Sequence, residues 1–216
     1  MGIALITSKM IAVFVGPGGM AYIGNFRNFI TSLEGISTLA FSSGVVKYVG
    51  ENEDKEKELT KIITTVLVTF LVFSTVLGFL IFVFSDFLCA KFFGNNLQYE
   101  IVFKVVAIVL PFSVVSVLFV SIINGLGSYS KLIYATIISN IVALVLTVLL
   151  IYEFKLVGAL LSTALNPTIL FTINFFYVPK ELQLLSRINL KQYDFSVLKK
   201  LAGFSIMILP FSCASK

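Results

Sequence analysis

Apolar runs long enough to cross a lipid bilayer are the feature that most restricts how this chain can fold. About 20 apolar residues in a helix are needed to span about 30 Å of hydrocarbon. Four runs reach that length, and they are Lys61–Ser85, Ile101–Asn124, Leu132–Tyr152 and Leu156–Val178. Only 12% of the residues are charged, against roughly 25% in an ordinary soluble domain. We therefore predict an all-α, polytopic membrane helix bundle.

Three further apolar segments differ from these four. Asn25–Val46 has the length of a span but carries Arg27 and Glu34. Ile3–Val15 and Leu201–Ala214 have only 13 and 14 residues, which is roughly 20 Å of helix and too short for a comfortable span. The bundle is therefore expected to hold about six to seven transmembrane helices, with the first and the last cut short.

The links between the segments predict a division into three parts. Residues 1–178 are expected to form a six-helix transmembrane lobe with a truncated first helix. Residues 179–200 interleave leucines with basic residues, so they predict an amphipathic cytoplasmic linker at the membrane surface. Residues 201–216 would begin a seventh, truncated helix. Turn or charge signals separate the segments at Gly16–Gly19, Glu51–Lys61, Asp86–Glu100, Asn124–Lys131 and Tyr152–Lys155.

The positive charges indicate how the segments cross the membrane. Ten Lys and Arg residues follow the second, fourth and sixth segments, and four lie on the opposite side. Cytoplasmic loops carry the excess of Lys and Arg, so the connections after the even segments are expected to be cytoplasmic. The net charge of +5 is spread along the flanks of apolar runs. It therefore favours a membrane protein with no nucleic-acid partner.

The residue types that most catalytic sites need are sparse. The chain has no histidine, and its two cysteines, Cys89 and Cys213, are far apart in the sequence. The commonest general base and metal ligand is therefore missing, and two distant thiols do not make a zinc site or a disulfide framework. We predict a protein that is not an enzyme and uses neither a metal nor another cofactor.

Polar residues inside the apolar segments are candidates for function, because ionisable groups are costly in lipid and tend to face cavities. Each can also be read as an interfacial anchor or a snorkelling side chain. If they share one lumen, they form a cationic path that suits an anionic, phosphate-bearing substrate, since Arg and Lys both bind phosphate. The candidate substrate-binding residues are Lys9, Asn25, Arg27, Asn28 and Lys47.

The segment Lys9–Gly50 resembles the start of Wzx-type lipid-linked oligosaccharide flippases, above all the O-antigen and enterobacterial common antigen flippases. The resemblance is carried by the Gly-Pro-x-Gly turn at 16–19, by the triplet Asn25-Phe26-Arg27 and by Gly44–Val49. Weaker similarities cover most of the remaining chain, at Phe93–Asn95, Val106–Val109, Asn124-Gly125, Gly158–Leu161 and Asn166-Pro167.

The resemblance implies one lobe of a MATE-like exporter, which has two six-helix lobes around a central cavity and works by alternating access. Such flippases move undecaprenyl-pyrophosphate-linked glycans across the bacterial inner membrane, among membrane lipids, and work with a polysaccharide polymerase and a chain-length regulator. Family members have about twelve helices, so this chain would supply the N-terminal half and is expected to be a fragment.

Three alternatives remain open. A cation-coupled drug exporter of the same superfamily would need acidic cavity residues, and Glu34 is the one candidate in a central segment. A membrane enzyme acting on polyprenyl phosphates would need an acidic metal-binding cluster, for which only Glu51–Asp54, among lysines, could serve. The third alternative is an inactive truncated product.

Overall fold

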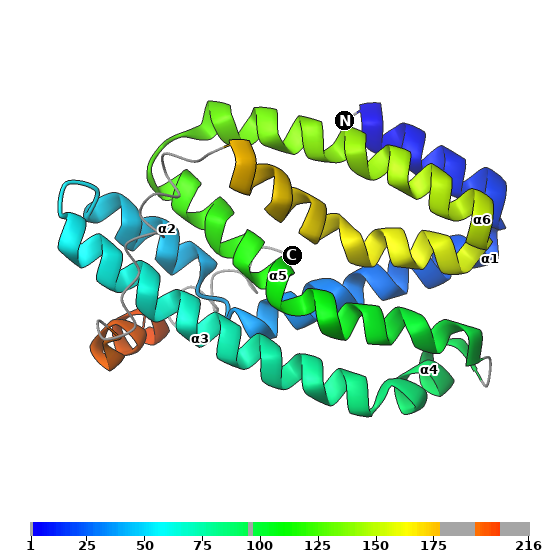
Figure 1. Cartoon of the computed structure of the whole chain (residues 1–216), viewed down its shortest axis with the longest axis horizontal. Coiled ribbons are helices and arrows are strands. Elements are labelled where there is room, and N and C mark those ends of the chain that lie inside the picture. The colour runs from blue at the N-terminus through cyan, green and yellow to red at the C-terminus, as the bar shows by residue number, and fades with distance from the viewer. Residues whose placement is uncertain (1, 95–96, 178–192, 204–216) are drawn as a thin grey trace, which may run out of the picture.

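The computed structural model describes residues 2–94, 97–177 and 193–203, and all structural statements below concern those residues. They form helices and no strands (Figure 1), which confirms the predicted helical membrane bundle. Residues 195–203 are helical as well. The named elements are α1 (Gly2–Ser37), α2 (Ser42–Glu51), α3 (Glu56–Val83), α4 (Ser85–Phe93), the short 3₁₀ helix η1 (Leu97–Tyr99), α5 (Glu100–Gly125) and α6 (Tyr129–Tyr177).

Three helices of the described part are long and apolar enough to cross a membrane, and they are α3, α5 and α6. The pair Gly18–Ser37 and Ser42–Glu51 is long and apolar enough only when taken together, with a bend of 48° between its two helices. The apolar runs predicted from the sequence thus coincide with α3, α5 and the two parts of α6.

Sharp bends divide the two longest helices where turn signals were predicted. Gly16 leaves helical geometry inside α1, with φ 78°, a value that glycine adopts at little cost. Lys155 does the same inside α6, with φ 50° and ψ −120°. Figure 1 shows the two arms of α6 running back along each other. A Cβ at Gly158 would collide with the carbonyl of Leu150, so only glycine fits inside this turn.

The expectation of one continuous helix over Asn25–Val46 is wrong, because α1 ends at Ser37 and α2 begins at Ser42. Leu39 and Ala40 have φ values of 50° and 54°, which cost energy for residues with a Cβ. Local hydroxyl groups favour the break. Thr38 donates its side-chain proton to the Glu34 carbonyl at 2.8 Å, and such bonds compete with the helical ladder.

Two connections are more helical than predicted. Asp86–Glu100 was predicted as a connection with a turn signal but contains α4 and η1, and Cys89 on α4 is buried. Glu51–Lys61 was predicted as a charged loop, yet only residues 52–55 separate α2 from α3. Burial of Ser85 and Cys89 against the bundle stabilises α4.

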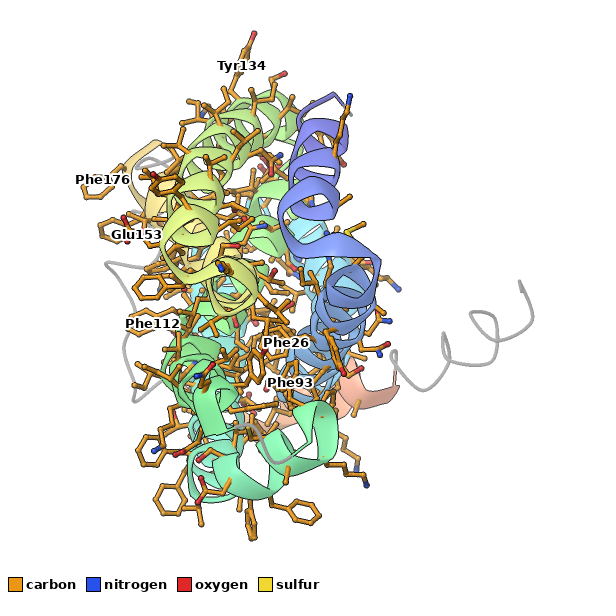
Figure 2. The ribbon with its side chains drawn as sticks, turned by 90° about the vertical axis from the view of Figure 1, so that its right-hand side faces the viewer. Phe26, Phe93, Phe112, Tyr134, Glu153 and Phe176 are labelled. Atoms are coloured by element: carbon orange, nitrogen blue, oxygen red, sulfur yellow. The ribbon has the colours of Figure 1, made fainter. Side chains whose placement is uncertain are left out.

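The core gathers around α5, which contacts α2, α3, α4 and α6. Phe103 is fully buried there and lies edge-on to Phe26 of α1, with 5.9 Å between ring centroids. Figure 2 shows Phe26 and Phe93 within the bundle, whereas Phe112, Tyr134 and Phe176 point away from it. Small residues allow close helix packing in membranes, and a Cβ at Gly78 would lie 2.6 Å from the carbonyl oxygen of Ala107.

The predicted division of the chain falls partly outside the described residues, which omit 178–192 and 204–216. The end of the predicted linker is helical and continues into Leu201, which is fully buried. This short helix is tied to α3, because the ammonium of Lys61 lies 2.6 Å from a carboxylate oxygen of Asp194.

Candidate functional site

A polar cavity of about 550 Å³ lies beside the break between α1 and α2. Its walls come from the end of α1, the start of α2, the middle of α5 and both arms of α6. The break itself opens the cavity, because the chain turns at residues 38–41 and carries Ser42 and Ser43 to its rim. The other polar lining residues are Glu34, Ser113, Ser116, Ser121, Asn124, Thr136, Ser139, Asn140 and Asn166.

Glu34 is the charged residue among those lining the cavity, since no Lys or Arg of the described residues joins it there. Its Oε1 atom is buried and has no hydrogen-bond partner among the described residues. The side chain of Ser113 is its neighbour from α5. One turn further along α5, Ser116 is 2% exposed, and its hydroxyl oxygen also lacks a partner. These three side chains belong to the polar part of the cavity lining.

Three of the hydroxyl groups that line the cavity donate to the backbone of their own helix. Ser113 donates to the Leu110 carbonyl at 2.9 Å, and Ser121 donates to the Val117 carbonyl at 2.8 Å. Thr136 on α6 donates to its own helix in the same way, at 2.7 Å. A hydroxyl has one proton and two lone pairs, so Ser121 and Thr136 offer acceptor lone pairs to the cavity, whereas the Ser113 side chain also hydrogen-bonds the Glu34 carboxyl.

The five predicted substrate-binding residues lie on the surface of the described structure, outside the cavity lining. Asn25, Arg27 and Asn28 share the exposed side of α1 with Thr31 and Ser32. We call these five residues the polar face of α1. The opposite side of the same helix is apolar and buried against the core, through Phe26, Ile30 and Leu33.

The other two predicted residues lie on separate helical segments. Lys9 is exposed on the first arm of α1, before the bend at Gly16. Lys47 is exposed on α2, beyond the break, where its ammonium lies 3.8 Å from Glu51 and 5.9 Å from the centre of the Tyr48 ring. The structure thus groups Asn25, Arg27 and Asn28 on one face and places Lys9 and Lys47 on neighbouring segments. Their role in substrate binding stays a prediction.

The serines of α5 were not predicted as site residues, although their spacing in the sequence indicated a shared polar side of the helix. Ser113, Ser116, Ser121 and Asn124 are spaced by three, five and three residues, which places them on one side of a helix. Asn140 and Asn166 of α6 line the cavity as well, and buried Asn174 has no partner for its amide among the described residues.

Part of this chain is similar in sequence to known transport proteins. A segment of 109 residues is 31% identical to the protein named "Lipid III flippase" of Escherichia coli (strain K12), and it covers 50% of this chain and 26% of that relative. The Shigella flexneri protein of the same name matches to the same extent. The matched segment thus spans about a quarter of the length of these relatives, which are transporters and not enzymes. No solved structure matches.

A family match covers far more of the chain than these relatives do. Residues 27–214 match the family described as "Polysaccharide biosynthesis protein". The matched range contains the broken helix after Arg27, the α5 serines and both arms of α6. It therefore includes every wall of the cavity, and the chain belongs to the polysaccharide biosynthesis protein family.

Proposed function

We propose that this chain forms the N-terminal lobe of a flippase that moves an undecaprenyl-pyrophosphate-linked oligosaccharide, such as an O-antigen unit, across the bacterial inner membrane by alternating access. The family match and the flippase relatives support the transport of lipid-linked glycans at a coarse level. We propose in addition the finer points of this function, which are the glycan, the undecaprenyl carrier, the inner membrane as the location, and a polysaccharide polymerase and a chain-length regulator as partners.

The polar face of α1 is the observation that carries this proposal. Elsewhere the exposed surface of the bundle is rich in large apolar side chains, for example Phe79 at 68% and Phe176 at 76% exposure. A charged side chain directed at lipid is costly, so the side of α1 that carries Arg27 is expected to face water or a second lobe. A two-lobed flippase would provide that setting, with the polar face of α1 lining its central cavity.

Arg27 would contact the pyrophosphate of the substrate. A guanidinium group forms two parallel hydrogen bonds to phosphate oxygens, and Asn25 and Asn28 offer amide donors on the same face. Lys9 and Lys47 lie on the segments before and after this face, so they extend the positive charge along the proposed path. A lysine acts there as a point charge and holds no fixed geometry, which would let the substrate move past it.

A complementation experiment tests the proposal. The chain would be expressed in a strain that lacks its lipid-linked oligosaccharide flippase, alone and together with the second lobe of the deleted flippase. We expect surface polysaccharide to return in at least the second case. No surface polysaccharide in either case, with the chain present in the membrane, would count against the proposed function.

Substitution of Arg27 tests whether its guanidinium group contacts the substrate. We expect Arg27→Ala to lower the restored surface polysaccharide by about tenfold or more, because losing a charge-assisted contact costs on the order of 1.5–3 kcal/mol. Arg27→Lys should retain part of the activity. Lys91→Ala on α4 is the matched control, since Lys91 is an exposed cation outside the predicted path. Normal polysaccharide in Arg27→Ala cells would exclude the cationic path.

The cation-coupled drug exporter remains a second candidate because of one observation, the acidic cavity at Glu34. Acidic cavities without Lys or Arg suit cationic drugs, whereas the polar face of α1 suits an anionic substrate. The two functions differ in a simple growth assay. A drug exporter would raise resistance to cationic dyes such as ethidium, and the proposed flippase would leave that resistance unchanged.

A further inference from the structure

The helix formed by residues 195–203, called the linker helix below, has two sides of opposite character. Leu201 is fully buried and belongs to the core of the bundle. Phe195 is 71% exposed, and Lys199 and Lys200 are exposed as well. Lys199 follows Phe195 by four residues and therefore lies beside it on the same face of the helix. The exposed side thus combines an aromatic ring with positive charge.

The linker helix is held at the membrane boundary of α3. The backbone N–H of Asp194 donates to the Thr65 hydroxyl at 3.1 Å, and the Asp194 carboxylate pairs with Lys61 at 2.6 Å. The apolar run of α3 starts at Ile62, so Thr65 lies about one helical turn inside it. Figure 1 shows the linker helix at the end of the bundle that holds the α2–α3 connection. The linker helix therefore lies at the level where lipid headgroups meet acyl chains.

The positive charge of the exposed side is not neutralised by acidic neighbours. Residues 195–203 contain no Asp or Glu. The carboxylate of Asp194, which precedes them, is already paired with Lys61. Neither Lys199 nor Lys200 forms an ion pair within the part of the chain that the structure describes. Two ammonium groups are thus available to an anion that approaches from outside the bundle.

We propose that the exposed side of the linker helix binds anionic phospholipids of the membrane leaflet at this end of the bundle. The ring of Phe195 would lie among the upper parts of the acyl chains, because aromatic side chains favour the membrane interface. The ammonium groups of Lys199 and Lys200 would contact the headgroup phosphates, which long lysine side chains can reach from an apolar surface. This site is separate from the polar face of α1, and the proposal does not depend on the proposed flippase function.

The charge pattern favours lipids with a net negative charge over zwitterionic lipids. A zwitterionic headgroup carries its own cationic group, and the linker helix offers that group no free carboxylate. A headgroup such as phosphatidylglycerol has only the phosphate charge. Anionic lipids attract basic segments close to the membrane surface, so Lys199 and Lys200 should enrich such lipids around the helix.

The way in which the linker helix is held makes this selection depend on charge. An ordinary interfacial helix buries its whole apolar face among the acyl chains, a contact that any phospholipid can provide. Here the apolar side is occupied by the bundle, through the buried Leu201. Only Phe195 and Tyr193, which is 43% exposed, remain as large exposed apolar or aromatic groups of the segment. Contact with lipid is therefore left to a few aromatic atoms and to the two lysines.

A single tryptophan tests the proposal, because the chain contains no Trp of its own. The 216-residue chain with Phe195→Trp would be reconstituted in vesicles of equal parts phosphatidylglycerol and phosphatidylcholine. Bromine on the acyl chains of one lipid or the other then quenches the tryptophan fluorescence on contact. We expect a preference for phosphatidylglycerol of about fivefold or more, since one lysine near an anionic surface contributes about that factor. High salt, about 0.5 M, should reduce the preference.

Substitution of the two lysines separates charge from mere proximity to lipid. Lys199→Gln combined with Lys200→Gln, in the Phe195→Trp chain, should leave the tryptophan in contact with lipid but reduce the preference to about twofold or less. Both side chains are exposed, so the fold should tolerate the change. Tyr193→Trp provides a second reporter on the same segment if Phe195→Trp does not fold.

Phe87→Trp on α4 is the matched control. Phe87 is 64% exposed, and, like Phe195, it follows an Asp and precedes a Lys by four residues. It differs in having a single lysine, Lys91, whose charge the neighbouring Asp86 offsets. The control should therefore be quenched by both lipids with a preference of about twofold or less.

Three outcomes would overturn the proposal. The first is equal quenching of the Phe195→Trp chain by the two brominated lipids. The second is a preference for phosphatidylglycerol that persists after both lysines are replaced. The third is fluorescence that neither lipid quenches, with the emission of a tryptophan in water, which would mean that this side of the helix faces water or a soluble partner. Since no transport is measured, none of these results bears on the proposed flippase function.

Discussion

Single side chains decide how the segment after residue 192 is held against the bundle. Asp194 accepts a hydrogen bond from the backbone N–H of Ser196 at 2.7 Å, and its own backbone N–H donates to the Thr65 hydroxyl at 3.1 Å. The ammonium of Lys61 and the Ser196 N–H together lower the pKa of the Asp194 carboxyl well below its usual range. An aspartate that caps a helix and also meets a lysine is thus a local anchor for the helix at 195–203.

This anchor should make stability depend on acid pH. Folding lowers the pKa of the Asp194 carboxyl. The Asp194 carboxylate therefore contributes fully to the stability of the fold above the ordinary aspartate pKa of about 3.9, and this contribution is lost progressively as the pH falls toward the lower pKa of the folded chain. Asp194→Asn should lower Tm at neutral pH by at most about 4 °C, since exposed ion pairs contribute little. Its deficit should shrink progressively as the pH falls below about 4, and melting in detergent at a series of pH values compares both chains. Asp54→Asn, in the exposed loop, is the control, and an undiminished deficit in acid would contradict the assignment.

Residue patterns in the sequence revealed some polar positions and missed others for a physical reason. Arg27 interrupts an apolar run with a charge, so it was recognisable, and it is indeed exposed on a polar face. Ser113 and Ser116 lie in a run that stays strongly apolar, so the two serines do not stand out in the sequence. The cavity arises only when several helices bring such residues together, which no single segment can reveal.

At the scale of helices, the close approach of α3 and α5 depends on glycine. A Cβ at Gly78 would lie 2.6 Å from the Ala107 carbonyl oxygen. We expect Gly78→Ala to destabilise the chain by about 1–3 kcal/mol, because the two helices must move apart. Gly24→Ala is the matched control, since a Cβ there meets nothing within 4 Å. Unfolding in mixed detergent measures both, and equal stabilities would show that the helices can adjust without cost.

Helix positions were predictable where length and hydropathy act together, as in α3, α5 and the two arms of α6. The bends at Gly16 and Lys155 were also predictable, because glycine, proline and charge mark them. The break at residues 38–41 was not, since Leu39 and Ala40 carry no local signal for positive φ. Tertiary packing around the cavity stabilises this strained turn. Such packing involves residues far apart in the chain, so a short stretch of sequence does not reveal it.

At the scale of the whole molecule, the connections gather at two opposite ends. Figure 1 places the α2–α3 and α5–α6 connections at one end and α4 with the bend of α6 at the other. A Cβ at Gly50 would lie 3.1 Å from the Gly125 carbonyl oxygen, which confirms that the ends of α2 and α5 meet. The first end carries Lys55 and Lys131, so the positive-inside bias predicts that it faces the cytoplasm.

Cysteine labelling tests this orientation. In a chain with Cys89→Ala and Cys213→Ala, Asn52→Cys should react with a membrane-impermeant thiol reagent only after the cells are permeabilised. Glu153→Cys, at the opposite end of the bundle, should react in intact cells, because Glu153 is exposed there. The reverse pattern would invert the topology.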